Sequence, residues 1–141
     1  MAVTDIIVSE DKGLMTTDGT VLPFVASFDV TTPEGQALAF NASQSAEEKL
    51  DDHVGDVIDI AGFYVEVIGV EDDITGEVEA RPHVIIIDAD GVCYEAQSKT
   101  LPKTLAKLDS IYHISEGGHV KVEVGKRKAR VGQMFTLKVV L

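Results

Sequence analysis

The sequence predicts a mostly β domain with one helix, folded as a small, partly open barrel. β-branched residues dominate residues 57–96 and 120–141 and often alternate with polar ones, which is typical of strands with one buried face. Between these regions, at residues 101–112, the apolar residues recur every three or four positions, which is typical of an amphipathic helix. The predicted order is therefore three strands, a helix and two strands.

The first strand of this series, residues 57–70, is long and changes phase near Gly62. Ile58 and Ile60 share one parity, whereas Val65 and Val67 have the opposite parity. A phase shift around a glycine predicts a β-bulge, which lets one strand bend between two halves of a sheet. An acidic loop at residues 71–79 then turns the chain.

The second and third strands form a tight hairpin. Residues 81–88 (RPHVIIID) are the second strand and residues 92–96 the third, with Asp90-Gly91 as the turn between them.

The helix is expected over residues 101–112. Its apolar stripe consists of Leu101, Leu105, Leu108, Ile111 and Tyr112. Pro102 suits a first helical turn, Ser98 or Thr100 is the candidate N-cap, and Gly117-Gly118 follow the end. Residues 120–124 and 133–141 alternate as the last two strands. This order, with its bulged first strand, is that of the OB-fold, a five-stranded, partly open barrel that binds oligonucleotides or oligosaccharides.

Residues 1–55 differ from this pattern, and we expect them to form an N-terminal arm or an extra hairpin beside the barrel of residues 56–141. Residues 21–30 and 37–42 are candidate strands, separated by the turn chemistry of residues 31–35 (TTPEG). Residues 43–52 are polar and acidic, either a short helix or a linker. The 141 residues suffice for one domain with a buried core and such an arm.

The charges are divided unevenly along the chain, whose formal net charge is -12. Residues 1–96 hold 3 of the 12 basic residues and 21 of the 24 acidic ones, whereas residues 97–141 hold the other 9 basic residues and only 3 acidic ones. This asymmetry indicates either an end that binds polyanions or a solvated basic face on an acidic protein.

The loop between the last two strands carries the densest positive charge. Four of its five residues from 126 to 130 are cations: Lys126, Arg127, Lys128 and Arg130. Such a loop neutralises phosphates and releases counterions, and the alternative is that it serves solubility and protects a sheet edge. Because the corresponding loop of OB-folds flanks the ligand groove, we favour phosphate contact, with Lys121 and Lys99 extending the path.

Single-stranded nucleic acid also needs aromatic side chains on which bases stack. Tyr64 has parity opposite to Val65 and is expected to face outward beside the bulge. Tyr94 shares parity with Val92 and Ala96, so it either stacks on a base or lies in the core with its hydroxyl at the rim. Phe63 is a further candidate whose direction the bulge leaves open. Phe135 is expected in the core.

The sequence favours a function without catalysis, cofactor or metal. Asp88 and Asp90 are explained by the hairpin turn, since no calcium-loop ligand series follows. The four histidines lack HExxH spacing, Cys93 is alone, and phosphate-loop and nucleophile-elbow motifs are absent. No apolar run approaches membrane length. The start of the chain lacks signal-peptide character, which together with the single cysteine predicts a location in a reducing cytoplasm.

The stretch from Asp90 to Thr100 (DGVCYEAQSKT) resembles the DG-x-x-Y-x-A-x-SKT segment of the single-stranded DNA-binding proteins of phi29-like bacteriophages. Residues 40–42 (FNA) match an earlier segment, and the resemblance extends over residues 38–141. It implies a replication protein that coats displaced single strands and protects them from nucleases. It also implies tyrosines as DNA contacts, which favours Tyr94 and, by an approximate correspondence, Tyr64. A further family tyrosine has no counterpart in residues 71–79.

We therefore predict a binder of single-stranded DNA without sequence preference. Further candidate partners are replication proteins such as a DNA polymerase, and a second copy of the chain through the N-terminal arm. The alternative is a protein-interaction or structural phage module on the same barrel, which docks on a partner by strand addition and binds no nucleic acid.

Overall fold

The computed structural model describes residues 6–9, 13–16, 21–22, 24–71, 73–128 and 133–141. Its elements, in chain order, are β1 (Ile6–Ser9), β2 (Gly13–Thr16), β3 (Val21–Leu22), β4 (Phe24–Ala26), α1 (Pro33–Ser45), β5 (Glu48–Lys49), the 3-10 helix η1 (Leu50–His53), β6 (Val57–Glu71), β7 (Val78–Asp88), β8 (Cys93–Gln97), α2 (Leu101–Tyr112), the 3-10 helix η2 (Ile114–Glu116), β9 (Val120–Lys128) and β10 (Gln133–Val139). In this part of the chain, no helix is long and apolar enough to cross a membrane.

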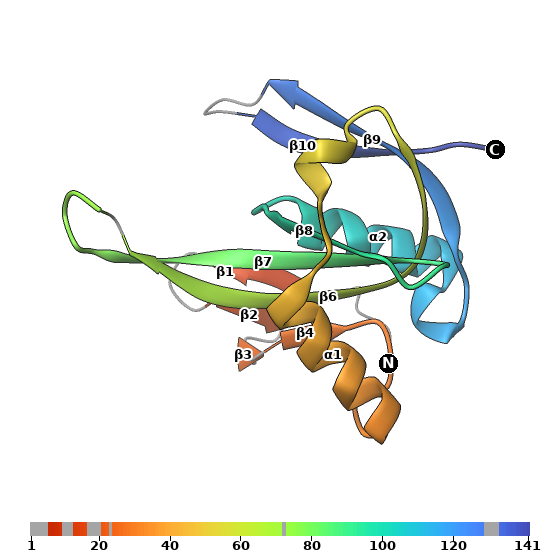
Figure 1. The fold of residues 1–141 in the computed structure, drawn as a ribbon, viewed down its shortest axis with the longest axis horizontal. Helices are drawn as coiled ribbons and strands as arrows, with labels where there is room; N and C mark the ends of the chain where they lie inside the picture. The colour runs from red at the N-terminus through yellow and green to blue at the C-terminus, as the bar shows by residue number, and fades with distance from the viewer. Residues whose placement is uncertain (1–5, 10–12, 17–20, 23, 72, 129–132) are drawn as a thin grey trace.

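The main sheet curls into a half-barrel around the core. Its order is β10-β9-β6-β7-β8-β5, with β4 paired to β6, and β1, β2 and β3 form a separate small sheet. Figure 1 shows β9 and β10 rising from the plane of β6 and β7, with α2 inside the curl. The predicted succession of three strands, α2 and two strands is confirmed, and the architecture is compatible with an OB-like barrel. The short strands β3 and β4 lie within the candidate strand of residues 21–30, whereas β1, β2, β5 and a second helix were not predicted.

One strand, β6, joins the two halves of the sheet. Its first residues, 57–60, pair with β9, whereas residues 60–71 pair with β7. The register with β7 shifts between Ile60 and Gly62, so Ala61 is the extra residue of the predicted bulge. At this bend Ser27 exchanges two hydrogen bonds with the backbone of Phe63, at 2.8 and 3.0 Å. A Cβ at Gly62 would lie 3.3 Å from the Ser27 Oγ, which explains the glycine.

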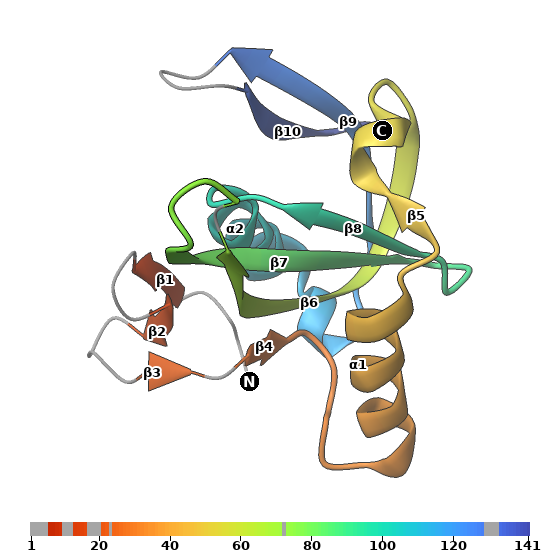
Figure 2. The ribbon, with the colours of Figure 1, turned by 60° about the vertical axis from the view of Figure 1, so that its left-hand side comes forward.

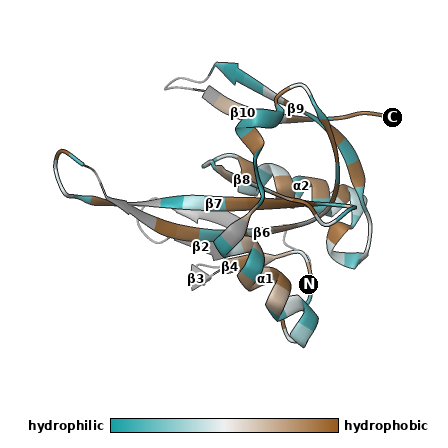
Figure 3. Cartoon of the chain, in the orientation of Figure 1, coloured by the Kyte–Doolittle hydropathy of each residue, from teal (hydrophilic) through white to brown (hydrophobic). Residues whose placement is uncertain are grey.

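The core has an inner and an outer layer, because both faces of β7 are covered. Val84 and Ile86 face the inside of the curl, where α2 packs. Ile85 and Ile87 face outward with Tyr64. Figure 3 shows this part of β7 as continuously hydrophobic, in agreement with a strand that is buried on both sides.

The helix α1 replaces the strand that was predicted at residues 37–42, and that prediction was wrong. Thr32 is the N-cap, with its Oγ1 accepting a hydrogen bond from the Gly35 nitrogen at 3.1 Å, and Pro33 occupies the first turn. The Thr-Pro-Glu-Gly sequence thus begins a helix instead of turning a hairpin. Ala39 and Ala42 pack on the outer layer of the core.

The predicted bounds of α2 are confirmed. Ser98, one of the two candidate caps, accepts a hydrogen bond from the Leu101 nitrogen at 3.2 Å.

The open side of the half-barrel is covered by β5 and η1, where we predicted a short helix or a linker. β5 pairs in parallel with β8, at Glu48 with Tyr94 and Lys49 with Glu95. Leu50, which begins η1, is completely buried in the inner core. Figure 2 shows β5 beside β8, below the β9–β10 hairpin. Residues 24–53 therefore belong to the same sheet and core as residues 57–139.

Candidate nucleic-acid interface

A groove of about 360 Å³ lies on this open side, between the half of the β9–β10 hairpin nearest its loop and the edge formed by β8 and β5. Its lining residues are Lys49, Asp51, His83, Glu95, Ala96, Gln97, Lys126 and Phe135. Two ammonium groups and one aromatic ring therefore meet carboxylates in a single hollow.

Lys126 and Phe135 form the hairpin wall of the groove. They are cross-strand partners in the β9–β10 register, and the Lys126 Nζ lies 5.0 Å from the centre of the Phe135 ring. Lys126 has the parity of Val122 and Val124, which are buried in the inner core, so it continues the inner face beyond that core. Phe135 is only half-buried. The predicted inward direction of Phe135 is thus correct, but the ring lies at the rim.

The other predicted basic residues are distributed around this wall. Arg127 and Lys128 are exposed, and the Arg127 Nε contacts the Met134 Sδ at 3.3 Å. Lys121, also exposed, has the parity of Arg127 and lies on the outer face of β9. Figure 3 shows the hairpin end of β9 as strongly hydrophilic.

The remaining two predicted cations, Lys99 and Arg130, are not among the residues that form this wall in the described part of the chain. Lys99 is exposed just before α2. Arg130 lies outside the described residues.

Tyr94 lies at the rim of the inner core, directly before Glu95, which lines the groove. Its hydroxyl donates a hydrogen bond to the Asp88 Oδ2 at 2.9 Å, and its ring meets the His53 ring edge-on at 5.0 Å. Burial, together with the Asp88 carboxylate, raises the pKa of Tyr94 to about 12. The Tyr94 ring therefore packs against the inner core with its hydroxyl bonded at the rim, and the residue lies next to the groove without lining it.

Tyr64 faces the side opposite Val65, as predicted, but it is not exposed. Only 7% of the residue is accessible, because α1 and β4 cover this face and Phe24 stacks on its ring at 5.5 Å. Burial and the neighbouring Glu66 raise the pKa of Tyr64 to about 12. Phe63, the other candidate beside the bulge, is 1% exposed within the inner core. The parity argument assigned Tyr64 to the correct face of β6, but it did not predict that α1 and β4 cover this face.

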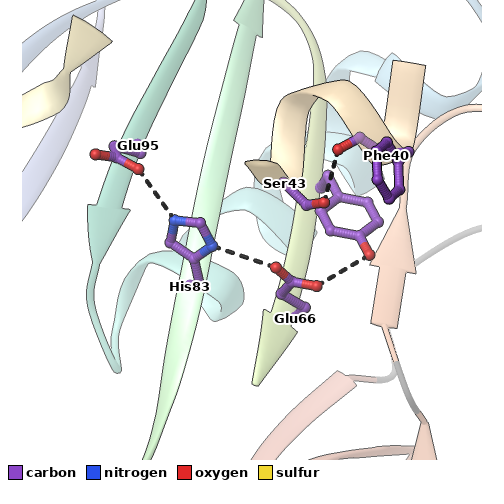
Figure 4. A network of polar contacts seen from close by, with 6 residues as sticks. Phe40, Ser43, Glu66, His83 and Glu95 are labelled. Carbon is purple, nitrogen blue, oxygen red and sulfur yellow. Dashed lines mark hydrogen bonds and ion pairs between the residues drawn. The ribbon is translucent and has the colours of Figure 1, made fainter. Parts of the chain in front are cut away.

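A row of polar side chains crosses the outer face of β6, β7 and β8 (Figure 4). The Tyr64 hydroxyl donates to Glu66 at 3.2 Å, and the two His83 nitrogens lie 3.3 Å from Glu66 and 3.3 Å from Glu95. His83 and Glu95 also line the groove. In the described part of the chain, no group of three or more His, Cys, Asp or Glu side chains is placed to hold a metal ion.

Sequence reasoning missed Lys49, Asp51 and His83 as groove residues. The first two come from a segment whose path was not predicted, and His83 was examined only for metal spacing. The position of Phe135 had a usable signal, because counting outward from the loop of residues 129–132 places it directly opposite Lys126.

Comparison with known protein families matches residues 18–140 to the model of the phage single-stranded DNA-binding proteins. The chain belongs to this family. The match includes α1, β5 and η1 as well as the barrel strands, and the family resemblance predicted from residues 90–100 is confirmed.

A curated relative supports the same assignment. The single-stranded DNA-binding protein of Bacillus phage B103 is 29% identical over 115 residues, which cover 78% of this chain and 89% of that protein. No solved structure gives a significant match.

Proposed function

We propose that this phage family member binds single-stranded DNA without sequence preference, in the groove between the β9–β10 hairpin and β8. The observation that carries the proposal is that the Lys126 ammonium lies 5.0 Å from the centre of the Phe135 ring, and that both residues line the same groove. Single strands require a cation for the phosphate and a ring face for the base, and every base offers such a face whatever its identity.

We further infer that the half-barrel is a variant of the OB-fold. β6, β7, β8, β9 and β10 correspond to its five strands, and α2 lies between the third and the fourth. In that fold the second and third strands and the loops after the first and fourth strands bind oligonucleotides. The β6–β7 and β9–β10 hairpins here extend on the same side of the molecule (Figure 1), which supports this assignment.

The proposed roles follow from position in the structure, except that of Arg130, which rests on the sequence alone. Lys126, Arg127, Lys128 and Arg130 attract phosphates, Lys49 adds a cation on the opposite wall, and Lys99 and Lys121 extend the basic surface. Phe135 and Tyr94 support bases. Contact of DNA with Tyr64 stays a prediction that requires α1 and β4 to move, and contact with Phe63 stays one that requires the inner core to open.

In the cell, such a protein coats and protects the strands displaced during phage DNA replication, and binding involves no catalysis. This role places it in the cytoplasm of the bacterial host. Interaction with replication proteins such as a DNA polymerase and self-association through residues 1–55 stay predictions.

A competition titration tests the proposal. Fluorescently labelled oligo-dT is bound at low salt and displaced with unlabelled single-stranded DNA, duplex DNA or RNA. We expect single-stranded DNA to compete best. The double variant Lys126→Ala/Lys128→Ala should bind the probe much more weakly, whereas Lys107→Ala/Lys138→Ala, with the same change of charge at exposed positions outside the groove, should bind nearly as well as the unmodified chain. Equal weakening by both pairs would argue against the groove.

A further inference from the structure

The segment from Glu47 to His53 spans the groove from one wall to the other. At its start, β5 pairs with β8. Just beyond its end, the Gly55 nitrogen donates to the Val124 carbonyl oxygen at 2.7 Å, which ties the chain to β9. Between these two attachments, the completely buried Leu50 anchors the segment in the inner core. The backbone that carries Asp51 is therefore held in place across the groove.

This segment is acidic, and it reaches the cation that the proposed function assigns to a phosphate. It contains Glu47, Glu48, Asp51 and Asp52. The Asp51 carboxylate forms an ion pair with the Lys126 ammonium, and both residues line the groove. The side chain of Asp51 is 62% exposed and that of Lys126 is 27% exposed. The carboxylate is thus free to rotate into solvent while Leu50 stays in the core.

We propose that Asp51 is an internal competitor of the DNA, and this inference rests on the proposed function. In the free protein its carboxylate occupies Lys126, and a phosphate of the incoming strand replaces it. The exchange requires rotation of one exposed side chain and leaves the backbone of the segment where it is. A polyanion that contacts several cations compensates for the lost ion pair, whereas a small anion does not. The contact therefore keeps the groove selective for extended strands.

The substitution Asp51→Asn tests this inference, with labelled oligo-dT as the probe and anisotropy as the readout. An exposed ion pair contributes little, so we expect binding to be about two- to fivefold tighter at low salt. The gain should shrink as salt rises, because ions screen an exposed pair. Asp52→Asn is the matched control, since Asp52 is exposed and carries the same charge one residue further along. It should produce a clearly smaller gain.

A second comparison tests whether the gain in DNA affinity depends on Lys126. In a chain that already carries Lys126→Ala, Asp51→Asn should give no further gain, because the two residues act as a pair. Equal gains from Asp51→Asn and Asp52→Asn, or a full gain in the Lys126→Ala chain, would overturn the inference and leave the proposed function standing. Failure of every variant to bind oligo-dT at low salt would instead overturn the proposed function. Asp51→Ser provides a second neutral variant if Asp51→Asn unfolds.

Discussion

Lys126 on β9 lies directly opposite Phe135 on β10, and its ammonium is centred 5.0 Å from the ring of that residue. The contact places a positive charge and a π-face together at one end of the inner core. Lys126 also forms an ion pair with Asp51, which lies on the opposite wall of the groove. A base that stacks on the Phe135 ring would therefore lie next to the cation that holds its phosphate.

Phe135→Leu should weaken binding of oligo-dT about 5- to 150-fold, since stacking of one base on an aromatic ring contributes about 1–3 kcal/mol. Leucine keeps an apolar side chain against the inner core, which limits the loss of stability. Phe135→Tyr, which retains the ring, is the control and should bind nearly as well as the unmodified chain. Anisotropy titrations at one fixed salt concentration measure the difference, and unchanged affinity of Phe135→Leu would exclude stacking there.

Lys128→Ala should reduce the dependence of DNA affinity on salt. Each lost phosphate contact lowers the slope of log affinity against log salt concentration by about 0.7 for a single strand. The same substitution at Lys107, an exposed lysine of α2, should leave the slope unchanged. The slope is measured by titrating the probe at several salt concentrations. A slope unaffected by Lys128→Ala would show that this lysine binds no phosphate.

The tyrosines should make the protein less stable in strong alkali. Burial raises the pKa values of Tyr64 and Tyr94 from 10.0 to about 12. Between these values the unfolded chain loses phenolic protons that the folded chain keeps, so the unfolded state is favoured increasingly. The stabilisation is complete below pH 10 and is lost as the pH rises towards 12.

Near-ultraviolet absorbance of tyrosinate, followed against pH in the folded and the denatured chain, checks this prediction. The folded chain should ionise at higher pH, and Tyr94→Phe should remove part of the delayed signal. Coincident titrations of the folded and denatured chains would contradict the burial of both hydroxyls.

His83→Gln should lower the free energy of unfolding by about 1.5–3 kcal/mol, the range for hydrogen bonds to charged groups. It removes the ring that separates Glu66 from Glu95, and the His83 side chain is only 12% exposed. His119→Gln is the matched control, because that ring also pairs with a carboxylate but is 62% exposed, where ion pairs contribute little. Denaturant unfolding of the two variants gives the comparison; equal losses would contradict the special position of His83.

Most of the barrel was predictable because its signals are local. Runs of β-branched residues located β6 and β7, the Asp90-Gly91 turn located β8, and alternation located β9 and β10. The phase change at Gly62 located the bulge, and the spacing of apolar residues gave the bounds of α2. The helix α1 was missed because its first residues are equally suited to a turn, and only packing of its alanines on Ile85 and Ile87 decides the matter. The division of the chain at residue 55 stays a prediction.

The site was less predictable than the fold, because it depends on contacts between distant segments. Parity assigned Tyr64 to the correct face but gave no information about the helix that covers it. Asp51 and Lys126 are far apart in sequence, and nothing local indicates that η1 reaches the hairpin. The cations of residues 126–130 were identified from composition alone, since a dense positive run on an acidic chain is conspicuous. Their placement in a loop was wrong for Lys126, Arg127 and Lys128, because β9 continues to Lys128 and these residues pair with β10.

The bulge at Ala61 has a consequence for the width of the groove. Both walls of the groove are joined to one continuous strand, β6. Its first four residues pair with β9, which pairs with β10, and the remainder pairs with β7, which pairs with β8. The bend of β6 at this point therefore determines the angle between the two walls, and with it the width of the groove between them.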